Sequence, residues 1–380
     1  MSLSPKRWIS SLAGLLAVAA WLPCAVQAAH TARSMPPIRH VFVIVLENEP
    51  FDVTFGPKSL APYLAHSLPA QGALLTQYFG TGHSSLDNYI ALISGQAPNP
   101  ETQQDCGQLV EFRASTGRLD PDGQLAGHGC IYPATVPNLT DQLRQAKWQW
   151  KGYMEGMGSD PAREAASCGH AAIGTHDATN GETLRDRYAD KHNPFVYFHS
   201  IIDDPVYCGR HVVPLDSLEA DLKRTASTPN YAFITPDLCH DGHDAPCKNG
   251  EPGGLVSADA FLRRWVPLIT AAPAFRKDGL LIITFDEGTD GQACCGERGL
   301  PGGPPPGGEL GPGGGRIGAV LLSPFIKPGT VSGQPYNHYS TLRGVERWFG
   351  LPFIGYAGAS DLPVFGADVF TRWKLSRQQH

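Results

Sequence analysis

Four short apolar runs constrain the fold of this chain more than any other feature of its sequence. They lie at residues 40–46, 231–235, 279–285 and 317–322, and each is dominated by Val, Ile, Leu or Phe. Continuous apolar runs of this length are typical of strands buried on both faces of a parallel sheet. Helical patterns lie between and after them, at residues 85–93, 138–148 with Asn138 as the cap, 214–225, 258–271 and 339–349. Strands that alternate with helices predict an α/β fold, with helices on both faces of a central, mostly parallel sheet.

Polar pairs follow two of these runs. Glu47 and Asn48 come directly after the first run, and Asp286 and Glu287 come directly after the third. The carboxyl ends of the strands in such a sheet converge on the crevice where ligands bind. Each pair alone would be expected to do no more than cap a turn. Together, their carboxylates are costly to gather unless a cation neutralises them, so we predict a shared divalent metal site.

A hydroxyl-rich turn between the two pairs can supply a nucleophile. It reads Gly-His-Ser-Ser-Leu-Asp-Asn-Tyr from Gly82 to Tyr89 and enters a helical pattern. Ser84 and Ser85 are both suited to capping that helix. A helix N-terminus also favours an anion such as a phosphoryl group, and a nearby metal favours the alkoxide of a serine. Either hydroxyl can therefore be proposed as the attacking group.

Histidines gather in two further segments. His240, Asp241 and His243 follow the run at 231–235, which places them at the same edge of the sheet, and His338 precedes the helical pattern at 339–349. Each histidine is able to bind metal, hold a phosphate oxygen or protonate a leaving group. His192 has two interpretations, a site residue or the fixing of a turn before an apolar segment.

Residues 1–28 have the organisation of a secretory signal peptide. Lys6 and Arg7 precede an apolar run, and small residues follow near Ala28, where a signal peptidase would cut. A lipoprotein signal at Cys24 is the less favoured alternative, because Pro23 precedes it. We therefore predict an exported protein, periplasmic or secreted, with one domain over residues 29–380. No later stretch predicts a transmembrane anchor.

The remaining cysteines indicate disulfides, because an even number in an exported chain is typical of structural bonds. Proximity in sequence suggests three pairs and leaves two adjacent cysteines, bonded either to each other or in a different arrangement altogether. The three pairs are Cys106 with Cys130, Cys168 with Cys208, and Cys239 with Cys247, and the adjacent residues are Cys294 and Cys295.

Two segments without regular periodicity lie close to the predicted site in sequence. Residues 101–137 are rich in Gly, Asp and Pro and predict an insertion tied by a disulfide, which would roof the site. Residues 299–315 are so rich in Gly and Pro that they cannot form a regular element. An inert loop is favoured there over a mobile flap.

These segments, in this order, resemble an exported phosphoesterase family that contains bacterial and fungal acid phosphatases and bacterial phospholipases C. The resemblance covers residues 39–349 in pieces, among them HVFVIVLENEPFDVTFG, GHSSLDNYIALISG, YADKHNPFVYF, ITPDLCHDGHD, ITFDEG and YNHYSTLRGVE. The small secreted acid phosphatases, including those that act on phosphatidylinositol 3-phosphate, are the most similar type. The resemblance implies an alkaline-phosphatase-like α/β fold, a divalent metal cofactor and a serine nucleophile.

The resemblance also distributes roles among the candidate residues. Ser85 precedes the Leu-Asp-Asn-Tyr stretch that matches the family's pattern, so it is the expected nucleophile, with Ser84 as the alternative. The expected metal ligands are Glu47, Asp286 and Glu287, and Asp241 is a further candidate ligand. The candidate substrate contacts are Asn48, His83, His192 and His240, and the candidate acids for the leaving group are His338 and His243. Asp241, His243 and His338 are also able to bind a second metal.

The predicted function is that of an exported, metal-dependent acid phosphatase. The substrate is a small-molecule or lipid phosphate monoester, with phosphoinositides among the candidates, and the reaction passes through a phosphoserine. A phospholipase C-type phosphodiesterase and a non-catalytic protein that binds phosphate or a headgroup are the alternatives. Loss of Lys6 and Arg7 with the leader changes the formal charge from −6 to −8, which argues against nucleic acid as a partner.

Overall fold

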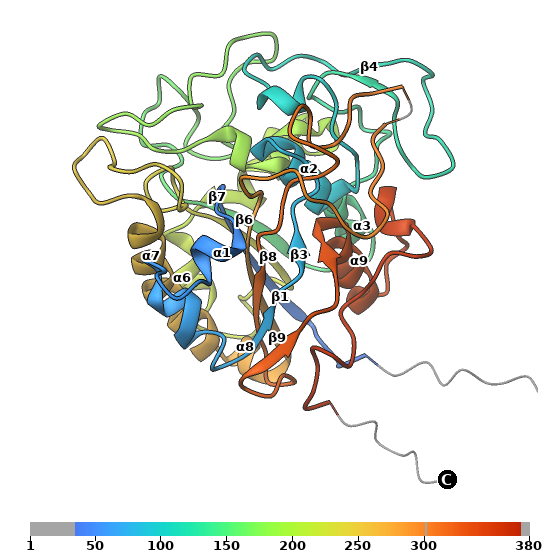
Figure 1. Ribbon diagram of the computed structural model, residues 1–380. Helices are drawn as coiled ribbons and strands as arrows, with labels where there is room; N and C mark the ends of the chain where they lie inside the picture. Colours follow the sequence, from blue (N-terminus) through green and yellow to red (C-terminus); the bar gives the residue numbers. More distant parts are fainter. Residues whose placement is uncertain (1–34, 301, 374–380) are drawn as a thin grey trace, which may run out of the picture. The chain divides into compact units, whose positions relative to one another are not determined.

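The core of the molecule is one eight-stranded sheet. The computed structural model describes residues 35–300 and 302–373, so the predicted signal peptide lies outside the described residues. Within these residues, the strand order is β11-β2-β10-β9-β1-β8-β6-β7. Strand β1 (His40–Leu46) runs through the middle, parallel to β8 (Tyr231–Thr235) on one side and to β9 (Gly279–Phe285) on the other (Figure 1). Only β10 (Ala319–Leu322) pairs antiparallel to its neighbours in this sheet, so the predicted mostly parallel α/β fold is confirmed.

The three central strands have the bounds that their apolar runs predict. Every residue of β1, β8 and β9 is buried, because other strands pair with both edges and helices cover both faces. The fourth predicted strand begins at Ala319, later than expected. The other strands are β2 (Ala73–Leu75), β3 (Tyr78–Phe79), β4 (Arg113–Ala114), β5 (Gly127–His128), β6 (Trp150–Met154), β7 (Val212–Pro214), β11 (Thr330–Ser332) and β12 (Tyr336–Asn337).

Helices lie on both sides of the sheet. Helices α2, α3 and α9 contact one another on one side, and α7 lies on the other (Figure 1). Asn138 caps α3 as predicted, since its side chain accepts hydrogen bonds from the amides of Thr140 and Asp141. The helices are α1 (Phe51–Thr54), α2 (Ser85–Ser94), α3 (Leu139–Gln145), α4 (His199–Ile202), α5 (Pro205–His211), α6 (Ser217–Asp221), α7 (Gly254–Ala271), α8 (Pro273–Asp278) and α9 (His338–Phe349). Shorter turns of helix are η1 (Tyr63–Ser67), η2 (Thr102–Gln104), η3 (Asp190–His192), η4 (Pro194–Tyr197) and η5 (Gly355–Gly358).

One predicted helix is much shorter than its sequence pattern. The pattern at 214–225 becomes α6, which covers only Ser217–Asp221. Pro214 is instead the last residue of the edge strand β7, where the missing amide hydrogen of proline is tolerated. Among the described residues, no helix has the length and hydropathy that a bilayer span requires.

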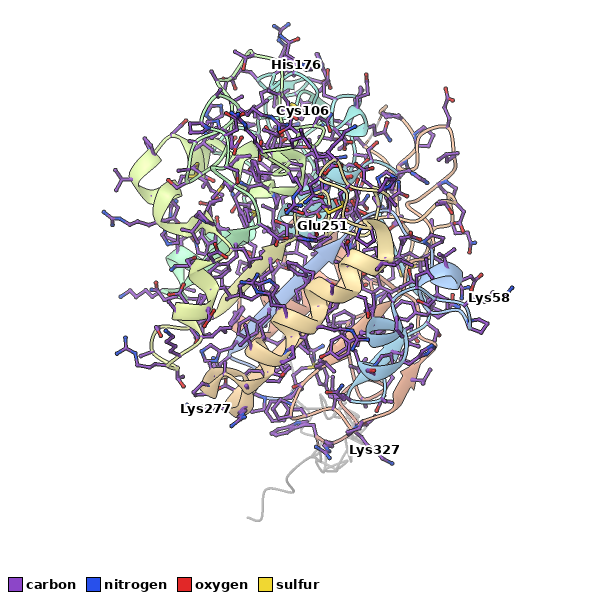
Figure 2. All side chains as sticks on the ribbon, turned by 90° about the vertical axis from the view of Figure 1, so that its left-hand side faces the viewer. Lys58, Cys106, His176, Glu251, Lys277 and Lys327 are labelled. Atoms are coloured by element: carbon purple, nitrogen blue, oxygen red, sulfur yellow. A yellow bond between two sulfur atoms is a disulfide. The ribbon has the colours of Figure 1, made fainter. Side chains whose placement is uncertain are left out.

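Disulfide-tied loops lie beyond the carboxyl ends of the central strands. Figure 2 shows Cys106 and His176 at this end of the molecule, with Lys277 and Lys327 at the opposite end. The segment at 101–137, called the insertion below, is closed by the bond between Cys106 and Cys130. The other bonds also join the neighbours in sequence, namely Cys168 with Cys208, Cys239 with Cys247, and Cys294 with Cys295.

Candidate active site

The pairing of the central strands brings the two polar pairs to one point. The last residues of β1 and β9 are partners, so Glu47 and Asp286 leave the sheet side by side. The amide of Asn48 donates to Asp286 Oδ1 at 2.9 Å. The amide of Glu47 donates to the carbonyl oxygen of Asp241 at 2.8 Å, which joins the segment after β8 to the other two. Carboxylates from three adjacent strand ends therefore converge, as the parallel sheet predicts.

Ser85 directs its hydroxyl group at these carboxylates. It is the first residue of α2, and its Oγ donates to Glu47 Oε1 at 2.9 Å in a buried contact. Ser84 is the N-cap residue, but its side chain does not cap the helix. Ser84 Oγ donates instead to the carbonyl oxygen of Gln103 at 2.9 Å. The two serines thus point in different directions, Ser85 into the carboxylate cluster and Ser84 toward the insertion.

Lys191 also belongs to the site, although it was not among the residues predicted from the sequence. Its Nζ lies 3.2 Å from Glu47 Oε1 and 3.3 Å from Asp105 Oδ2. Burial raises the pKa of Glu47, but the charges of Lys191 and His192 outweigh burial and hold this pKa well below its ordinary value. Asp105, which also went unrecognised, accepts a hydrogen bond from the Leu86 amide at the start of α2. The site therefore pairs an ionised Glu47 with a buried ammonium group.

Glu47, His192 and Asp286 form a group that fits a divalent cation. All three are buried, and their ligand atoms lie within 4.8 Å of one another. His192 was expected to contact substrate, but its ring lies in this group and stacks on Tyr89 with a centroid separation of 5.1 Å. Asp286 Oδ2 is buried without a hydrogen-bond partner, and burial, together with the charge of Glu47, raises the pKa of Asp286 well above its ordinary value. A cation would satisfy this oxygen and offset the gathered negative charge.

Glu287 and Asp241, the other predicted metal ligands, lie beside this group. Glu287 Oε2 accepts a hydrogen bond from Asn88 Nδ2 at 3.0 Å. Asp241 Oδ2 lies 3.9 Å from His192 Nδ1. Burial raises the pKa of both carboxyl groups, and the charges of nearby carboxylates raise it further. Both side chains thus belong to one buried acidic cluster with Glu47 and Asp286.

Asn48, His83 and His243 border this acidic cluster. His243 is the most exposed of the three, with a side-chain exposure of 47%, and its Nδ1 lies 3.8 Å from Glu47 Oε2. Its Nε2 lies 3.3 Å from Asn48 Nδ2. Asn48 has a φ of 54°, a left-handed conformation that asparagine tolerates better than most residues. His83 Nδ1 lies 3.7 Å from Glu287 Oε1, and its Nε2 has no hydrogen-bond partner. These side chains therefore form the border of the acidic cluster.

His338 lies behind the site, which does not fit its predicted role as the acid for the leaving group. Its Nε2 contacts the main-chain carbonyl oxygen of Asp286 at 2.6 Å, and its Nδ1 contacts the Tyr78 hydroxyl at 3.2 Å. Burial lowers the pKa of His338 to about 4. With both ring nitrogens engaged inside the protein, His338 supports the loop after β9. It also cannot join Asp241 and His243 around a second metal without losing these contacts.

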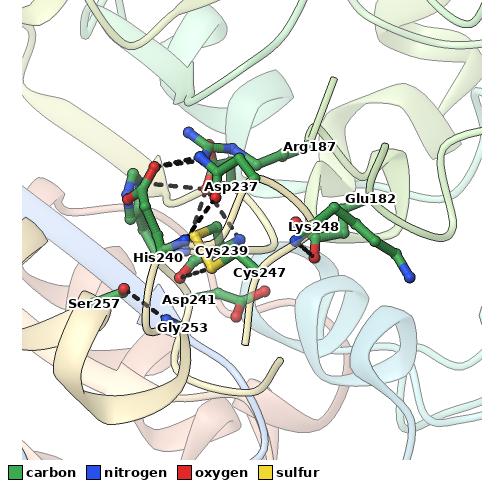
Figure 3. Close-up of a disulfide and its surroundings, with 12 residues drawn as sticks. Glu182, Arg187, Asp237, Cys239, His240, Asp241, Cys247, Lys248, Gly253 and Ser257 are labelled. Atoms are coloured by element: carbon green, nitrogen blue, oxygen red, sulfur yellow. Dashed lines mark hydrogen bonds and ion pairs between the residues drawn. A yellow bond between two sulfur atoms is a disulfide. The ribbon is translucent and has the colours of Figure 1, made fainter. Parts of the chain in front are cut away.

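His240 lies outside the acidic cluster, so its predicted contact with substrate does not fit the structure either. Its ring lies beside the Cys239–Cys247 disulfide, with Arg187 and Asp237 close by (Figure 3). Its Nδ1 contacts Glu155 Oε2 at 3.0 Å, and its Nε2 contacts Glu251 Oε2 at 3.2 Å. Burial alone would lower the pKa of His240, but these carboxylates raise it to about 9. His240 thus stabilises the loop that carries Asp241.

Comparison with known proteins assigns the chain to a family. The Phosphoesterase family model matches residues 61–352, which is most of the chain and includes Ser85, Lys191 and Asp286. The chain belongs to the Phosphoesterase family. It is therefore a hydrolase of phosphate esters, as predicted.

Individual relatives are distant in sequence. A phosphatidylinositol-3-phosphatase of Mycobacterium tuberculosis is 25% identical over 340 residues, which cover 90% of this chain and 86% of the relative. A probable acid phosphatase of Kluyveromyces lactis is 25% identical over 320 residues, covering 83% of this chain but only 59% of the relative. Among solved structures, a protein of the alkaline phosphatase superfamily from Vibrio parahaemolyticus aligns with a TM-score of 0.48 and 13% identity, over 87% of this chain and 72% of the other.

Proposed function

We propose that the protein is a metal-dependent phosphomonoesterase that works through a phosphoserine at Ser85. The contact between Ser85 Oγ and Glu47 Oε1 carries this proposal. It aims a hydroxyl group at buried carboxylates beside the ammonium group of Lys191. Similarity to proteins named acid phosphatase and phosphatidylinositol-3-phosphatase supports phosphate monoesters as substrates.

Glu47, Asp286 and His192 would hold the divalent cation, with Glu287 and Asp241 beside them. When bound, a divalent cation lowers the pKa of a neighbouring hydroxyl group and offsets the negative charge of the transferring phosphoryl group.

The chain's own side chains carry out the steps of transfer. Ser85 Oγ attacks phosphorus and passes its proton to Glu47 Oε1, the acceptor of its hydrogen bond, while the bond to the leaving alcohol breaks. Water then attacks the phosphoserine, which releases phosphate and restores the serine hydroxyl group. Lys191 offsets charge near the nucleophile, and Asn48 contributes an amide donor to a phosphoryl oxygen. His243, the more exposed candidate acid, protonates the departing oxygen.

Purified protein tests this proposal with p-nitrophenyl phosphate and bis-p-nitrophenyl phosphate as the two substrates. We expect turnover of the monoester, a fall of at least about 1000-fold for Ser85→Ala, and little change for Ser84→Ala, which removes the neighbouring hydroxyl group. Acid quenching followed by peptide mass spectrometry should locate phosphate on Ser85. Preference for the diester would favour a phospholipase C-type activity. Full turnover by Ser85→Ala would refute Ser85 as the nucleophile, and phosphate binding without turnover would indicate a non-catalytic binder.

We also propose that the protein is exported, to the periplasm or to the medium. The four disulfides support this location, because such bonds persist mainly in oxidising compartments. Fractionation of cells producing the full chain tests it, and retention of a reduced protein in the cytoplasm would refute it.

A further inference from the structure

A cavity of about 510 Å³ lies against the turn that carries the nucleophile. His83 and Ser84, which directly precede Ser85 in the chain, form one end of it. The insertion and the Gly/Pro-rich loop at 299–315 supply the other walls. The lining residues outside the turn are Pro100, Gln103, Gln104, Pro304, Pro306, Gly307, Gly308, Glu309 and Leu310. The insertion, which was expected to roof the site, and the loop at 299–315, which was expected to be inert, therefore enclose a space next to the turn that carries Ser85.

Gln103 fastens these walls to each other and to the nucleophile turn. Its Nε2 donates to the carbonyl oxygens of Pro305 at 2.7 Å and Pro306 at 2.9 Å, both in the Gly/Pro-rich loop. Its own carbonyl oxygen accepts the hydrogen bond from Ser84 Oγ. Proline cannot donate a main-chain hydrogen bond, so this part of the loop has few donors of its own. The Gly308 amide donates to the Pro305 carbonyl oxygen at 2.9 Å, and the Pro306 carbonyl oxygen accepts from Gln103. The side chain of Gln103 supplies a further donor.

The walls of the cavity are poorly suited to an anion. No lysine or arginine is among the described residues that line it, and the one carboxylate among them belongs to the exposed Glu309. The rest of the surface is proline, glycine and leucine, with serine, glutamine and histidine as the polar side chains. An anionic group placed here would face Glu309 without a compensating cation. A neutral group would meet apolar walls and a few hydrogen-bonding atoms, the usual composition of a small-molecule pocket.

His83 connects the cavity to the reacting groups. Its side chain is largely buried, and its Nδ1 lies 3.7 Å from Glu287 Oε1 in the acidic cluster. Its Nε2 is buried and has no hydrogen-bond partner. His83 therefore lies between the cavity that it lines and the acidic cluster that Ser85 contacts.

We propose that this cavity binds the leaving group and selects uncharged alcohols over alcohols that carry further negative charge. The inference rests on the proposed phosphomonoesterase function. Gln103 is a positioning residue that holds the wall of the cavity. Substrates of this class are monoesters of aryl, sugar or other neutral alcohols, and a phosphoinositide, whose leaving group keeps a phosphodiester, is a poor fit.

Phenyl phosphate and 4-carboxyphenyl phosphate test the proposal, because they differ mainly by one negative charge on the leaving group. For the wild-type protein we expect kcat/KM to be at least about 10-fold higher for phenyl phosphate. Glu309→Lys should reduce this ratio about 3-fold, the size typical of one exposed charge pair, while Glu309→Gln should reduce it less. The dissociation constant of inorganic phosphate should not change in either variant. A short-chain phosphatidylinositol 3-phosphate should behave like the carboxylated substrate.

Gln103→Leu tests the wall itself. Loss of two hydrogen bonds should raise KM for phenyl phosphate about 5-fold and leave the inhibition constant of inorganic phosphate unchanged. Gln71→Leu is the matched control, and it should leave KM unchanged. Gln71 Nε2 also donates to a main-chain carbonyl oxygen, that of Ser67, but Gln71 is exposed and does not line the cavity. If the Gln103→Leu protein does not fold, the Glu309→Lys and Glu309→Gln proteins still test the leaving-group proposal.

The possible outcomes distinguish failure of the leaving-group proposal from failure of the proposed function. Equal kcat/KM for the two aryl phosphates in the wild-type protein, or a charge ratio that Glu309→Lys leaves unchanged, would overturn the leaving-group proposal while phosphatase activity stands. Absence of turnover for every monoester would instead refute the proposed function, and the leaving-group proposal would fall with it.

Discussion

Gly314 offers a direct test of whether the Gly/Pro-rich loop positions Ser85, the proposed nucleophile. Its amide donates to the carbonyl oxygen of Gly80 at 3.2 Å, and its own carbonyl oxygen accepts from the amide of Gly288 at 2.7 Å. A Cβ atom at Gly314 would overlap the carbonyl oxygen of Gly82 and would lie 2.8 Å from the carbonyl carbon of Gly80. Backbone atoms on both sides cannot rotate away. Gly314→Ala must therefore displace the segment that leads into Ser85.

The expected size of the effect follows from that displacement. A shift of about 1 Å in a reacting group can lower the rate about 100-fold, so we expect kcat for p-nitrophenyl phosphate to fall by about this factor. Steady-state kinetics measures the loss, and thermal unfolding followed by circular dichroism shows whether the protein remains folded. Gly107→Ala is the control, because a Cβ atom there meets nothing within 4 Å. A folded Gly314→Ala protein with wild-type kcat would refute the reasoning.

Three further results are expected. Lys191→Met should lower kcat about 100-fold in steady-state assays, because it removes a buried positive charge beside Glu47. Lys151→Met, which removes an ion pair with Asp221 at 2.6 Å, is the control and should leave kcat unchanged. Equal losses of kcat in the two variants would contradict a role of Lys191 at the site. Burial raises the pKa of Glu346 to about 9. The free energy of unfolding of the wild type therefore carries no penalty from Glu346 below about pH 4.5, the pKa of this group in the unfolded chain, and it declines as the pH rises toward 9. Glu346→Gln should therefore raise the free energy of unfolding in urea by about 2–4 kcal/mol over the wild type at pH 7.5, and by much less at pH 5. An equal difference in unfolding free energy at the two pH values would refute the raised pKa of Glu346. Dialysis against a chelator should abolish turnover and lower Tm, with recovery when one divalent ion is restored, and full activity in excess chelator would exclude a metal requirement.

The apolar runs predicted the central strands because burial on both faces leaves a simple signal. Strand β6 (Trp150–Met154) has no such signal, since Lys151 and Gly152 interrupt its apolar residues. Lys151 reaches the carboxylate of Asp221, and a side chain on Gly152 would collide with Phe195. Both features depend on neighbours that are distant in sequence. Local patterning cannot reveal them.

The candidate site was predicted in part for a similar reason. Residues that directly follow central strands, such as Glu47 and Asp286, could be placed from the strand pattern alone. His240 also follows a strand, but its ring turns to Glu155 and Glu251, a choice of rotamer that sequence does not show. Lys191 lies in an irregular segment, and its proximity to Glu47 comes only from the folded chain. The neighbouring His192, a predicted site residue, was the one indication in the sequence that this segment reaches the site.

The central position of β1 has a consequence for how the protein is made. Its two partners, β8 and β9, begin only at Tyr231 and Gly279, far along the chain. During synthesis from the N-terminus, the segment HVFVIVL is therefore exposed with both edges unpaired until most of the polypeptide exists. An unpaired apolar strand is a template for aggregation. Chains truncated before Tyr231 should accumulate as insoluble material without activity, because they lack Asp241 and Asp286, which lie beside Glu47.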